Sequence, residues 1–365
     1  MASTRPRVLV NAGGMLSGGG RMVVNAMLDE LGAGGDRGLE WKFIVADPVF
    51  RERLAADSVP VPLEPQSRSP ARRIVWEQMV LWKPSRRNEV LVSAGNFGPL
   101  ARRRRHILMV HSHLLFDGTK LRGRQGLRLR VQSALAQASA RRAALTITSS
   151  REMTDLVAPM TRHPPETLPL GPGRVKHHIP GPPDRFTFVH RTHWGPHKRF
   201  GELLLAVREL AAKRAGEFQL VTGCDPRTAF ARRFRESQVE RELLDDRQIA
   251  SHVRFQTFGA EGQATLEGDA VVMPSTAEAF CLPLGEAVAL GVPVVAADTP
   301  FARDLCGPGA FFVPSGEPPA LATAMERLLN GERPPPTPVE VRAKLSWAVY
   351  VDRLAELCRA AAGTP

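Results

Sequence analysis

The sequence predicts an α/β protein made of two Rossmann-like domains that face each other across a cleft. Short apolar runs alternate with helical stretches along most of the chain, which is typical of parallel sheets covered on both faces. The length of 365 residues favours two domains. A segment rich in Pro and Gly, residues 169–184, interrupts the alternation, and we place a linker at residues 173–184.

In the first domain, residues 1–172, apolar runs predict five strands. They lie at residues 7–11, 41–45, 90–93, 106–110 and 145–148. A glycine-rich loop at residues 13–20 leads into a predicted helix at residues 22–31, and another helix is predicted at residues 127–140. A strand, a glycine loop and a helix in this order are typical of nucleotide-binding α/β domains.

In the second domain, residues 185–338, the same alternation returns. The predicted strands are residues 186–189, 218–221, 253–255, 270–273 and 292–296, and the predicted helices are residues 202–212, 284–290 and 319–329. A Pro-rich break at residues 333–338 precedes a final helix, residues 339–365. Ligands of such sheets bind beyond the carboxyl ends of the strands, so we expect the ligand site in the cleft between the domains.

The charge balance favours anionic partners. Lys and Arg number 49 against 37 Asp and Glu, a formal net charge of +12, which attracts nucleic acid, anionic lipid or phosphorylated substrates. Compositional drift toward Arg would produce the same excess without a binding role. Aromatic residues make up only 6% of the chain, so stacking platforms for nucleic acid are scarce and we expect no nucleic-acid partner.

Nothing in the sequence predicts export or a transmembrane segment. No apolar run approaches the ~18 residues of a membrane-spanning helix, and Arg5 and Arg7 replace the apolar core of a signal peptide. The four cysteines lack CxxC spacing, which favours a reduced protein without structural zinc. We expect a cytoplasmic protein, with peripheral association at the cytoplasmic face of a membrane as an open alternative.

Several common catalytic motifs are absent from the sequence. It contains no GxxxxGK[ST] phosphate loop, no HExxH, no GxSxG and no complete GxGxxG. It also lacks Asp-x-Asp, so a metal-clamped diphosphate is not expected. His111 with His113, and His193 with His197, are weak candidates for metal ligands, because no Cys or carboxylate lies at ligand spacing from either pair and a Gly-Pro pair interrupts the second. We expect no metal and no other cofactor.

The informative stretch is residues 274–298, between two predicted strands. It places Glu278 and Glu286 eight positions apart, with a helix starting near Leu282 between them. A helix N-terminus with free N–H groups suits a diphosphate. Glu286, one turn inside the helix, can accept hydrogen bonds from a ribose diol, and Glu278 faces the side where a sugar would sit. A solvated pair of glutamates is the simpler alternative, but the apolar neighbours favour a cleft lining.

This stretch resembles the E-x7-E signature of family 4 glycosyltransferases, which are retaining enzymes of the GT-B fold. The resemblance continues through Pro-Ser, Glu-x-Phe-x-Leu-Pro and Gly-Val-Pro-Val-Val. Weaker matches occur elsewhere in the family's order. They are the glycines 18–20, Val110-His111-Ser112, Phe188-Val-His-Arg191, Lys198-Arg-Phe and Ser346-Trp347.

The resemblance implies a hexosyltransferase that moves a sugar from a nucleoside diphosphate sugar to an acceptor hydroxyl, with retention and without a metal. It implies that residues 1–172 bind the acceptor, that residues 185–338 bind the donor and that the final helix packs back on the first domain. The implied catalytic residues are His111, Glu278, Arg191 and Lys198, with the two cations gripping the diphosphate. The implied donor-binding residues are Gly19, Gly20, Arg191, Lys198, Arg199, Glu278, Ala279, Phe280, Cys281, Leu282 and Glu286.

Three departures from the family pattern stand out. His190 and Cys281 each occupy a place where the family usually has Gly. The gap from Arg191 to Lys198 is longer than in many members, so Arg199 could replace Lys198 as the diphosphate ligand. Structural roles are the alternatives for two of the implied catalytic residues. His111 would then be a hydrogen-bonded histidine at a strand end, and Arg191 a surface ion-pair residue.

Other functions are compatible with parts of the sequence. A GT-B epimerase or phosphorylase would keep the fold, and a basic protein that binds anionic surfaces or nucleic acid would explain the charge. The acceptor is not identified: a saccharide, a lipid-linked sugar or a small natural product would each serve.

Basic residues gather between residues 101 and 142, where only Asp117 opposes them. The predicted helix there mixes cations with an apolar stripe, namely Arg124, Leu127, Arg128, Val131, Leu135 and Ala138. Such a helix could lie on an anionic membrane. We expect the alternative, in which the apolar stripe packs into the domain core and the arginines are solvated.

Overall fold

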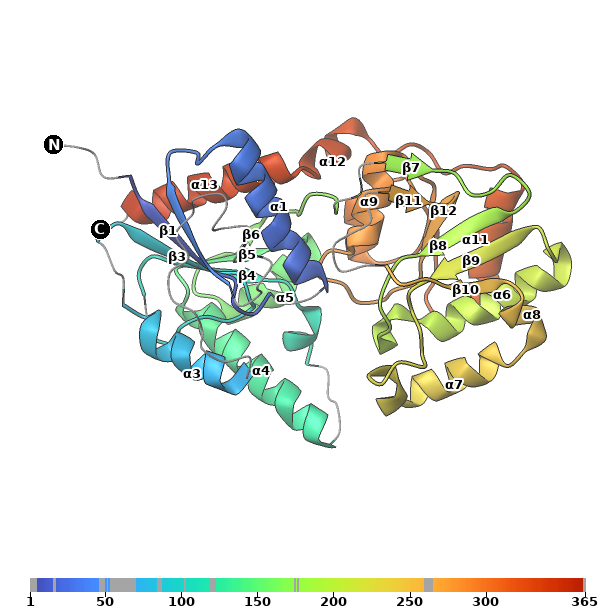
Figure 1. Ribbon diagram of the computed structural model, residues 1–365, viewed down its shortest axis with the longest axis horizontal. Helices are drawn as coiled ribbons and strands as arrows, with labels where there is room; N and C mark the ends of the chain where they lie inside the picture. Colours follow the sequence, from blue (N-terminus) through green and yellow to red (C-terminus); the bar gives the residue numbers. More distant parts are fainter. Residues whose placement is uncertain are drawn as a thin grey trace. The chain divides into compact units, whose positions relative to one another are not determined.

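A computed structural model describes residues 5–15, 18–45, 50, 52, 70–83, 87–101, 103–118, 123–173, 175, 177–258 and 265–363. The chain divides into two compact units. The first contains Met1–Gly171 and Ser346–Pro365, and the second contains Pro172–Leu345. Each unit is built on one six-stranded sheet (Figure 1).

The first sheet is parallel in every strand pair and has the order β2-β1-β3-β4-β5-β6. Its strands are β1 (Arg7–Asn11), β2 (Glu40–Ile44), β3 (Glu89–Ser93), β4 (His106–Val110), β5 (Leu145–Thr148) and β6 (Glu166–Thr167). β3 and β4 are buried at every position, as expected for central parallel strands. The five predicted strands are confirmed to within one residue at each end. β6 was missed, because two polar residues make no apolar run.

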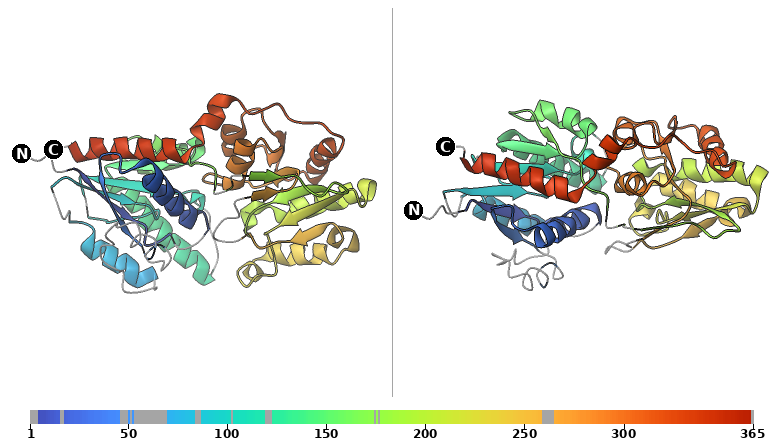
Figure 2. Two further views of the ribbon diagram at one scale, coloured as in Figure 1. Left: turned by 45° about the horizontal axis from the view of Figure 1, so that its top comes forward. Right: turned by 90° about the horizontal axis from the view of Figure 1, so that it is seen from above.

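Helices cover both faces of the first sheet. They are α1 (Gly18–Gly34), α3 (Pro70–Val80), α4 (Gly123–Arg142), α5 (Arg151–Val157) and α13 (Trp347–Gly363), with single 3-10 turns η1 (His113–Leu115) and η2 (Ala158–Met160). α3 and α4 lie on one side of the sheet, and α1 and α13 lie on the other (Figures 1 and 2). The glycines 18–20, predicted as the end of a loop, instead belong to the first turn of α1.

The C-terminal helix belongs to the first unit, as predicted. α13 packs against α1, and its Tyr350 is fully buried with its hydroxyl 3.5 Å from the sulfur of Met109. An ion pair joins Arg37 to Asp352 at 2.9 Å. The segment 339–365, predicted as one helix, holds two: α12 (Val339–Lys344) ends before Leu345, whose ψ of 68° is not helical.

The second sheet is also parallel, in the order β10-β9-β8-β12-β13-β14. Its strands are β8 (Phe186–His190), β9 (Phe218–Thr222), β10 (Val253–Phe255), β12 (Ala270–Met273), β13 (Val294–Ala297) and β14 (Phe311–Val313). A separate parallel pair joins β7 (His177–Ile179) to β11 (Thr265–Glu267). β7 lies inside the predicted linker, so part of that stretch is a strand. Its composition did not predict this, because β7 is a strand only through its pairing with β11.

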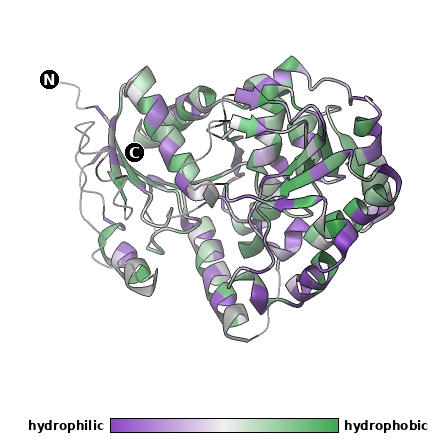
Figure 3. Ribbon diagram, turned by 45° about the vertical axis from the view of Figure 1, so that its right-hand side comes forward, coloured by the Kyte–Doolittle hydropathy of each residue, from purple (hydrophilic) through white to green (hydrophobic). Residues whose placement is uncertain are grey.

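The helices of the second unit contribute unequally to its apolar core. They are α6 (Phe200–Arg214), α7 (Arg235–Leu244), α8 (Arg247–Ala250), α9 (Leu282–Leu290), α10 (Pro300–Cys306), α11 (Pro318–Leu329) and α12, with 3-10 turns η3 (Pro196–Lys198) and η4 (Ala231–Arg233). α6 packs along α11 and buries Phe200, Leu204 and Val207 completely. The strands of this sheet are largely hydrophobic and its helices are mixed (Figure 3). Within the described residues, no helix has the length and apolarity needed to cross a bilayer.

Candidate active site

The two main motifs of the sequence start from one edge of the second sheet. β8 and β12 are neighbouring parallel strands, with Phe188 opposite Ala270. Chain segments that follow parallel strands leave a sheet at the same edge, which is where ligands of such sheets bind. Arg191 follows β8 directly, and residues 274–281 follow β12 and lead into α9.

Lys198 is held against this second segment by backbone contacts. It closes the turn η3, and Arg199 after it adopts a left-handed φ of 53° at the start of α6. The carbonyl of His197 accepts hydrogen bonds from the amide of Thr276 at 3.0 Å and from its hydroxyl at 3.4 Å. The tie between the two loops brings the Lys198 ammonium against the Glu278 carboxylate, and both side chains are largely buried.

Glu286 lies one turn inside α9 and is buried. Its Oε2 accepts a hydrogen bond from Nη1 of Arg191 at 3.1 Å. Burial raises the pKa of Glu286 to about 6, against the opposing charge of Arg191. Each glutamate of the E-x7-E stretch therefore has one buried cationic partner, and the partners are the two cations implied to grip a diphosphate.

Gly173 lies directly against Glu286. A Cβ atom at position 173 would lie 1.8 Å from Oε1 of Glu286, so a side chain there would displace this carboxylate. No motif in the sequence pointed to Gly173, which lies at the start of the predicted linker. The contact joins segments far apart in the chain, and only folding brings them together.

Arg199, the alternative to Lys198, has a different partner. Its half-exposed guanidinium pairs with Glu202, one turn further along α6. Lys198 rather than Arg199 therefore forms the ion pair with Glu278. The diphosphate contact of either residue stays a prediction.

His190, which stands where the family has glycine, fills the core instead of the site. It is completely buried, with Nδ1 3.1 Å from Oγ1 of Thr222 and its ring stacked on Phe200. Burial, and then the nearby charge of Lys198, lower its pKa to about 3. The ring is therefore neutral at physiological pH and packs as a structural side chain.

The N-terminus of α9 offers fewer free amides than the sequence suggested. Pro283 has no N–H, and the amides of Leu284 and Gly285 donate to the carbonyl of Cys281 at 3.0 and 3.3 Å. At most the amides of Cys281 and Leu282 are left in the first turn for a ligand. Cys281 itself adopts a φ of 26°, a left-handed conformation that explains why glycine suits this position.

The side chains just before α9 are mostly turned inward. Phe280 is buried, and its ring lies 3.4 Å from the place where a Cβ of Gly285 would be. It therefore supports the helix with its side chain. Ala279 and Leu282 are half-buried. The donor contacts predicted for these residues and for Cys281 remain predictions.

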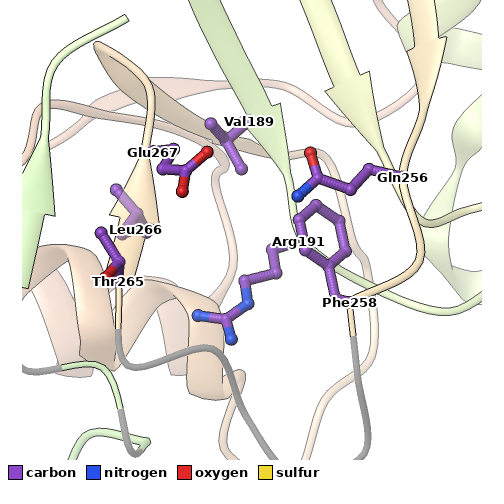
Figure 4. A pocket seen from close by; sticks show the side chains of 7 residues that line it. All are labelled: Val189, Arg191, Gln256, Phe258, Thr265, Leu266 and Glu267. Carbon is purple, nitrogen blue, oxygen red and sulfur yellow. The ribbon is translucent and has the colours of Figure 1, made fainter.

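A pocket opens beside Arg191 (Figure 4). It is lined by Val189, Arg191, Gln256, Phe258, Thr265, Leu266 and Glu267. The guanidinium carbon of Arg191 lies 5.6 Å from the centre of the Phe258 ring, a cation–π distance. Sequence reasoning missed Phe258 and Gln256, which carry no motif. Their position just after β10, at the carboxyl edge of the sheet, was the signal that could have found them.

Three predicted residues belong to the first unit, and their place in a donor site stays a prediction. His111 follows β4, and its amide donates to Oδ1 of Asn96 at 2.6 Å. Both ring nitrogens are buried without a partner in the described part of the chain, and burial lowers the pKa of His111 to about 4. Gly19 is exposed on α1, and Gly20 lies against Met15.

The candidate metal ligands do not come together. Among the residues that the structure describes, no three His, Cys, Asp or Glu side chains are arranged to hold a metal. His113 lies 3.5 Å from Oε1 of Glu152 and 3.1 Å from Oδ2 of Asp117. These carboxylates, the first more than the second, raise the pKa of the imidazole. His193 is exposed on its loop.

Comparison with protein families identifies the second unit. The sequence model of the family described as "Glycosyl transferases group 1" matches residues 173–346. The protein is a glycosyltransferase with a group 1 domain. The predicted family is thereby confirmed. A search of curated proteins gives no significant match to this glycosyltransferase.

Solved structures show that the glycosyltransferase has the GT-B fold over nearly its whole length. Sucrose-phosphate synthase from Thermosynechococcus elongatus matches with a TM-score of 0.69 and 16% identity, over 98% of this chain and 99% of that one. Anabaena HepE in complex with UDP and glucose matches with a TM-score of 0.66 and 18% identity, over 97% and 100%. A UDP-forming trehalose-phosphate synthase from Burkholderia vietnamiensis matches with a TM-score of 0.62 and 9% identity, over 97% and 100%.

Proposed function

We propose that the enzyme transfers a hexosyl group from a nucleoside diphosphate sugar to an acceptor hydroxyl, with retention and without a metal. The observation that carries the proposal is the pair of buried ion pairs, Arg191 with Glu286 and Lys198 with Glu278. The solved HepE complex contains UDP and glucose, so UDP-glucose is the first donor to test.

A diphosphate would exchange the partners in these two ion pairs. Arg191 and Lys198 would turn to the phosphate oxygens, where charge-assisted hydrogen bonds are strongest. Glu286 and Glu278 would then be free to accept hydrogen bonds from the ribose and sugar hydroxyls. The exchange leaves each buried charged group with a hydrogen-bonding partner, without which its burial would be costly.

The same cations would stabilise the reaction's developing charge. As the glycosidic bond breaks, the leaving nucleoside diphosphate gains negative charge, and fixed cations in a partly buried site stabilise that charge most effectively. This is the role that a metal plays in enzymes with an Asp-x-Asp clamp. With Arg191 and Lys198 in place, we expect turnover to continue in EDTA.

His111 would act as a hydrogen-bonding group toward the donor sugar. Its imidazole is neutral at physiological pH, because burial lowers its pKa to about 4. Its two ring nitrogens, buried and without a partner among the described residues, retain hydrogen-bonding capacity that a ligand could satisfy. Retention would follow if the acceptor attacks on the face that the leaving group vacates.

Calorimetry with UDP tests the diphosphate site. Arg191→Ala and Lys198→Ala should each weaken binding at least tenfold, on the order of the 1.5–3 kcal/mol of a hydrogen bond to a charged group. Lys213→Ala, on the exposed side of α6, is the matched control and should leave binding unchanged. Equal affinity in all three variants would overturn the site.

Product analysis tests the reaction. Nucleotide release from a panel of UDP- and GDP-sugars, with saccharide, lipid-linked and small natural-product acceptors, identifies the substrates, and mass spectrometry identifies the new glycoside. An α-configured product from an α-configured donor is expected by NMR. A sugar isomer without a new glycosidic bond would indicate an epimerase, and activity that EDTA abolishes and Mg²⁺ restores would refute metal independence.

A further inference from the structure

The outer faces of α3 and α4, in the first unit, expose large apolar side chains. These side chains are each more than a third exposed: Val75, Met79, Val80 and Trp82 at α3, and Leu127 and Val131 on α4. Met79 is 71% exposed and Leu127 is 57% exposed. We call this set, together with the exposed Arg128 and Arg130 beside it, the α3–α4 face.

The two helices lie next to each other. The carbonyl of Gly98 accepts a hydrogen bond from Nε2 of Gln78 on α3 at 3.1 Å and from Oγ of Ser139 on α4 at 3.0 Å. Both helices are therefore anchored to one backbone group. Figures 1 and 2 show them on the same side of the first sheet.

The structure corrects, for the N-terminal half of α4, the expectation that its apolar stripe packs into the core. The buried side of α4 consists of small residues, among them Ala136, Ser139 and Ala140. With these facing the domain, Leu127 and Val131 point to solvent. Leu127 and Val131 of the stripe thus form an outer surface, Leu135 and Ala138 are half-buried, and the side chain of Arg124 lies outside the described residues.

Trp82 is fixed in its exposed position by a buried ion pair. Arg103 donates to Oε1 of Glu89 at 2.7 Å and to the carbonyls of Leu81 at 2.8 Å and Lys83 at 3.3 Å. These carbonyls flank Trp82, whose ring is 40% exposed. Arg103, which lies within the basic segment 101–142, is therefore structural, and the backbone that it holds carries an exposed tryptophan beside the cation of Lys83.

The charge on the α3–α4 face is of one sign. α4 has no acidic residue, and the single glutamate of α3, Glu77, is buried. Arg128, Arg130 and Arg141 are exposed on α4. A second copy of this chain would bring like charges together, whereas an anionic lipid surface would complement both the arginines and the apolar side chains.

We infer that the α3–α4 face docks on the surface of an anionic lipid bilayer. Apolar side chains with flanking arginines are the features of helices that lie in the bilayer interface, and tryptophan is enriched at that depth. Docking would bring the glycosyltransferase to acceptors at the membrane. The inference concerns a binding surface and does not depend on the donor or the reaction proposed above.

Flotation with vesicles tests the inference on the full chain. Vesicles of phosphatidylcholine with 30 mol% phosphatidylglycerol should bind the protein at low salt, and pure phosphatidylcholine vesicles should bind it far less. Each exposed arginine near a charged surface contributes about fivefold in affinity, so Arg128→Gln with Arg130→Gln should weaken binding on the order of 25-fold. Added salt should remove this difference.

Matched variants distinguish binding through the α3–α4 face from non-specific binding through other exposed residues. At high salt, where the effect of the arginine substitutions is lost, Met79→Gln with Trp82→Gln should still weaken vesicle binding relative to the wild type. The control is Arg235→Gln with Val239→Gln on α7, because Val239 is 55% exposed and Val131 is 53% exposed. Thermal unfolding and UDP binding should be unchanged in every variant, which distinguishes a lost surface from a lost fold or a failed donor site.

Three outcomes would overturn the inference. The first is equal, negligible flotation with both vesicle compositions. The second is binding that the α7 control variant weakens as much as the α4 variant does. The third is a lipid-independent dimer in sedimentation equilibrium that Met79→Gln with Trp82→Gln abolishes, which would assign the face to a second copy of the chain.

Discussion

α6 of the second unit and α4 of the first each connect two parallel strands of a six-stranded sheet, yet they turn their large apolar residues in opposite directions. α6 buries Leu203, Leu204 and Val207 in the core. α4 presents mainly small residues to its domain and exposes Leu127 and Val131. An apolar stripe in a sequence therefore identifies a helix face without telling what covers it.

The largest expected effect comes from truncating the two helices in parallel. Leu204→Ala removes a completely buried side chain and should lower the free energy of unfolding by about 2–5 kcal/mol. Leu127→Ala removes a mostly exposed side chain and should change it by less than about 0.5 kcal/mol. Urea unfolding followed by circular dichroism measures both, and a large loss in Leu127→Ala would mean that the outer face of α4 is covered in the folded protein.

One glycine in each unit offers a second comparison, because alanine would displace a neighbouring side chain at Gly173 but meets open space at Gly32. Gly173→Ala should push the Glu286 carboxylate away and weaken UDP binding by about 1.5–3 kcal/mol, because donor hydroxyls would lose a charged acceptor. Gly32→Ala, in α1 of the first unit, meets no atom within 4 Å and should leave UDP affinity unchanged while favouring the helix by up to ~1 kcal/mol. Calorimetry measures UDP affinity for both variants. An unaltered dissociation constant in Gly173→Ala would contradict the proposal that Glu286 contacts the donor.

Buried carboxylates sharpen the comparison further. Glu89 of the first unit lies within ion-pair distance of both Arg103 at 2.7 Å and Arg7 at 3.8 Å. Among the described residues, Glu286 of the second unit forms an ion pair with Arg191, and burial raises its pKa to about 6. Glu89 therefore lies between two cations, whereas the proposed ribose ligand Glu286 is paired with Arg191 at 3.1 Å.

This difference predicts a pH dependence of stability. The pKa of Glu286 in the folded chain, about 6, lies above its ordinary value of 4.5, so the folded state binds the proton more tightly. Its favourable contribution is complete below about pH 4.5 and is lost as the pH rises through 6, by about 2 kcal/mol in all. Glu286→Gln does not titrate. Measured by urea unfolding, the free energy of unfolding of the variant minus that of the wild type should therefore rise by about this much between pH 4.5 and pH 7. A constant difference across that range would contradict the raised pKa.

The smallest expected effect concerns backbone strain. Asn96 in the first unit and Cys281 in the second both have left-handed φ angles, of 69° and 26°. Asn tolerates this region better than most residues, but Cys does not. Cys281→Gly should therefore be more stable than Cys281→Ala by about 1 kcal/mol, the reverse of the order inside a helix. Thermal unfolding of the two variants measures it, and an Ala variant that is the more stable would show that position 281 is unstrained.

Much of the fold was predictable because the sheets are parallel. Central parallel strands are buried on both faces, so they appear in the sequence as continuous apolar runs, such as β4 and β12. The exceptions are informative. β6 and β7 are short and polar, and each is a strand only because a neighbouring strand pairs with it.

The candidate site was predictable where its residues lie close in sequence. The spacing of Glu278 and Glu286 was visible, and so were the cations at Arg191 and Lys198. Their pairing was not visible, because the tie between His197 and Thr276 joins two separate loops. Phe258 was also missed: it belongs to no motif, and its position just after β10 was the one signal that could have found it.

The sequence by itself determined the alternation of strands and helices, the glycosyltransferase motif and the basic charge, because each is a property of neighbouring residues. The tertiary structure alone decided which carboxylate meets which cation, why a side chain at position 173 would displace Glu286, and which way Leu127 and Val131 of α4 face. These depend on side chains that meet only after folding: Glu286 against Gly173, or Ser139 of α4 against the carbonyl of Gly98. The pattern of neighbouring residues predicts where a helix or strand forms. Packing against distant segments decides which of its faces is buried and which is exposed.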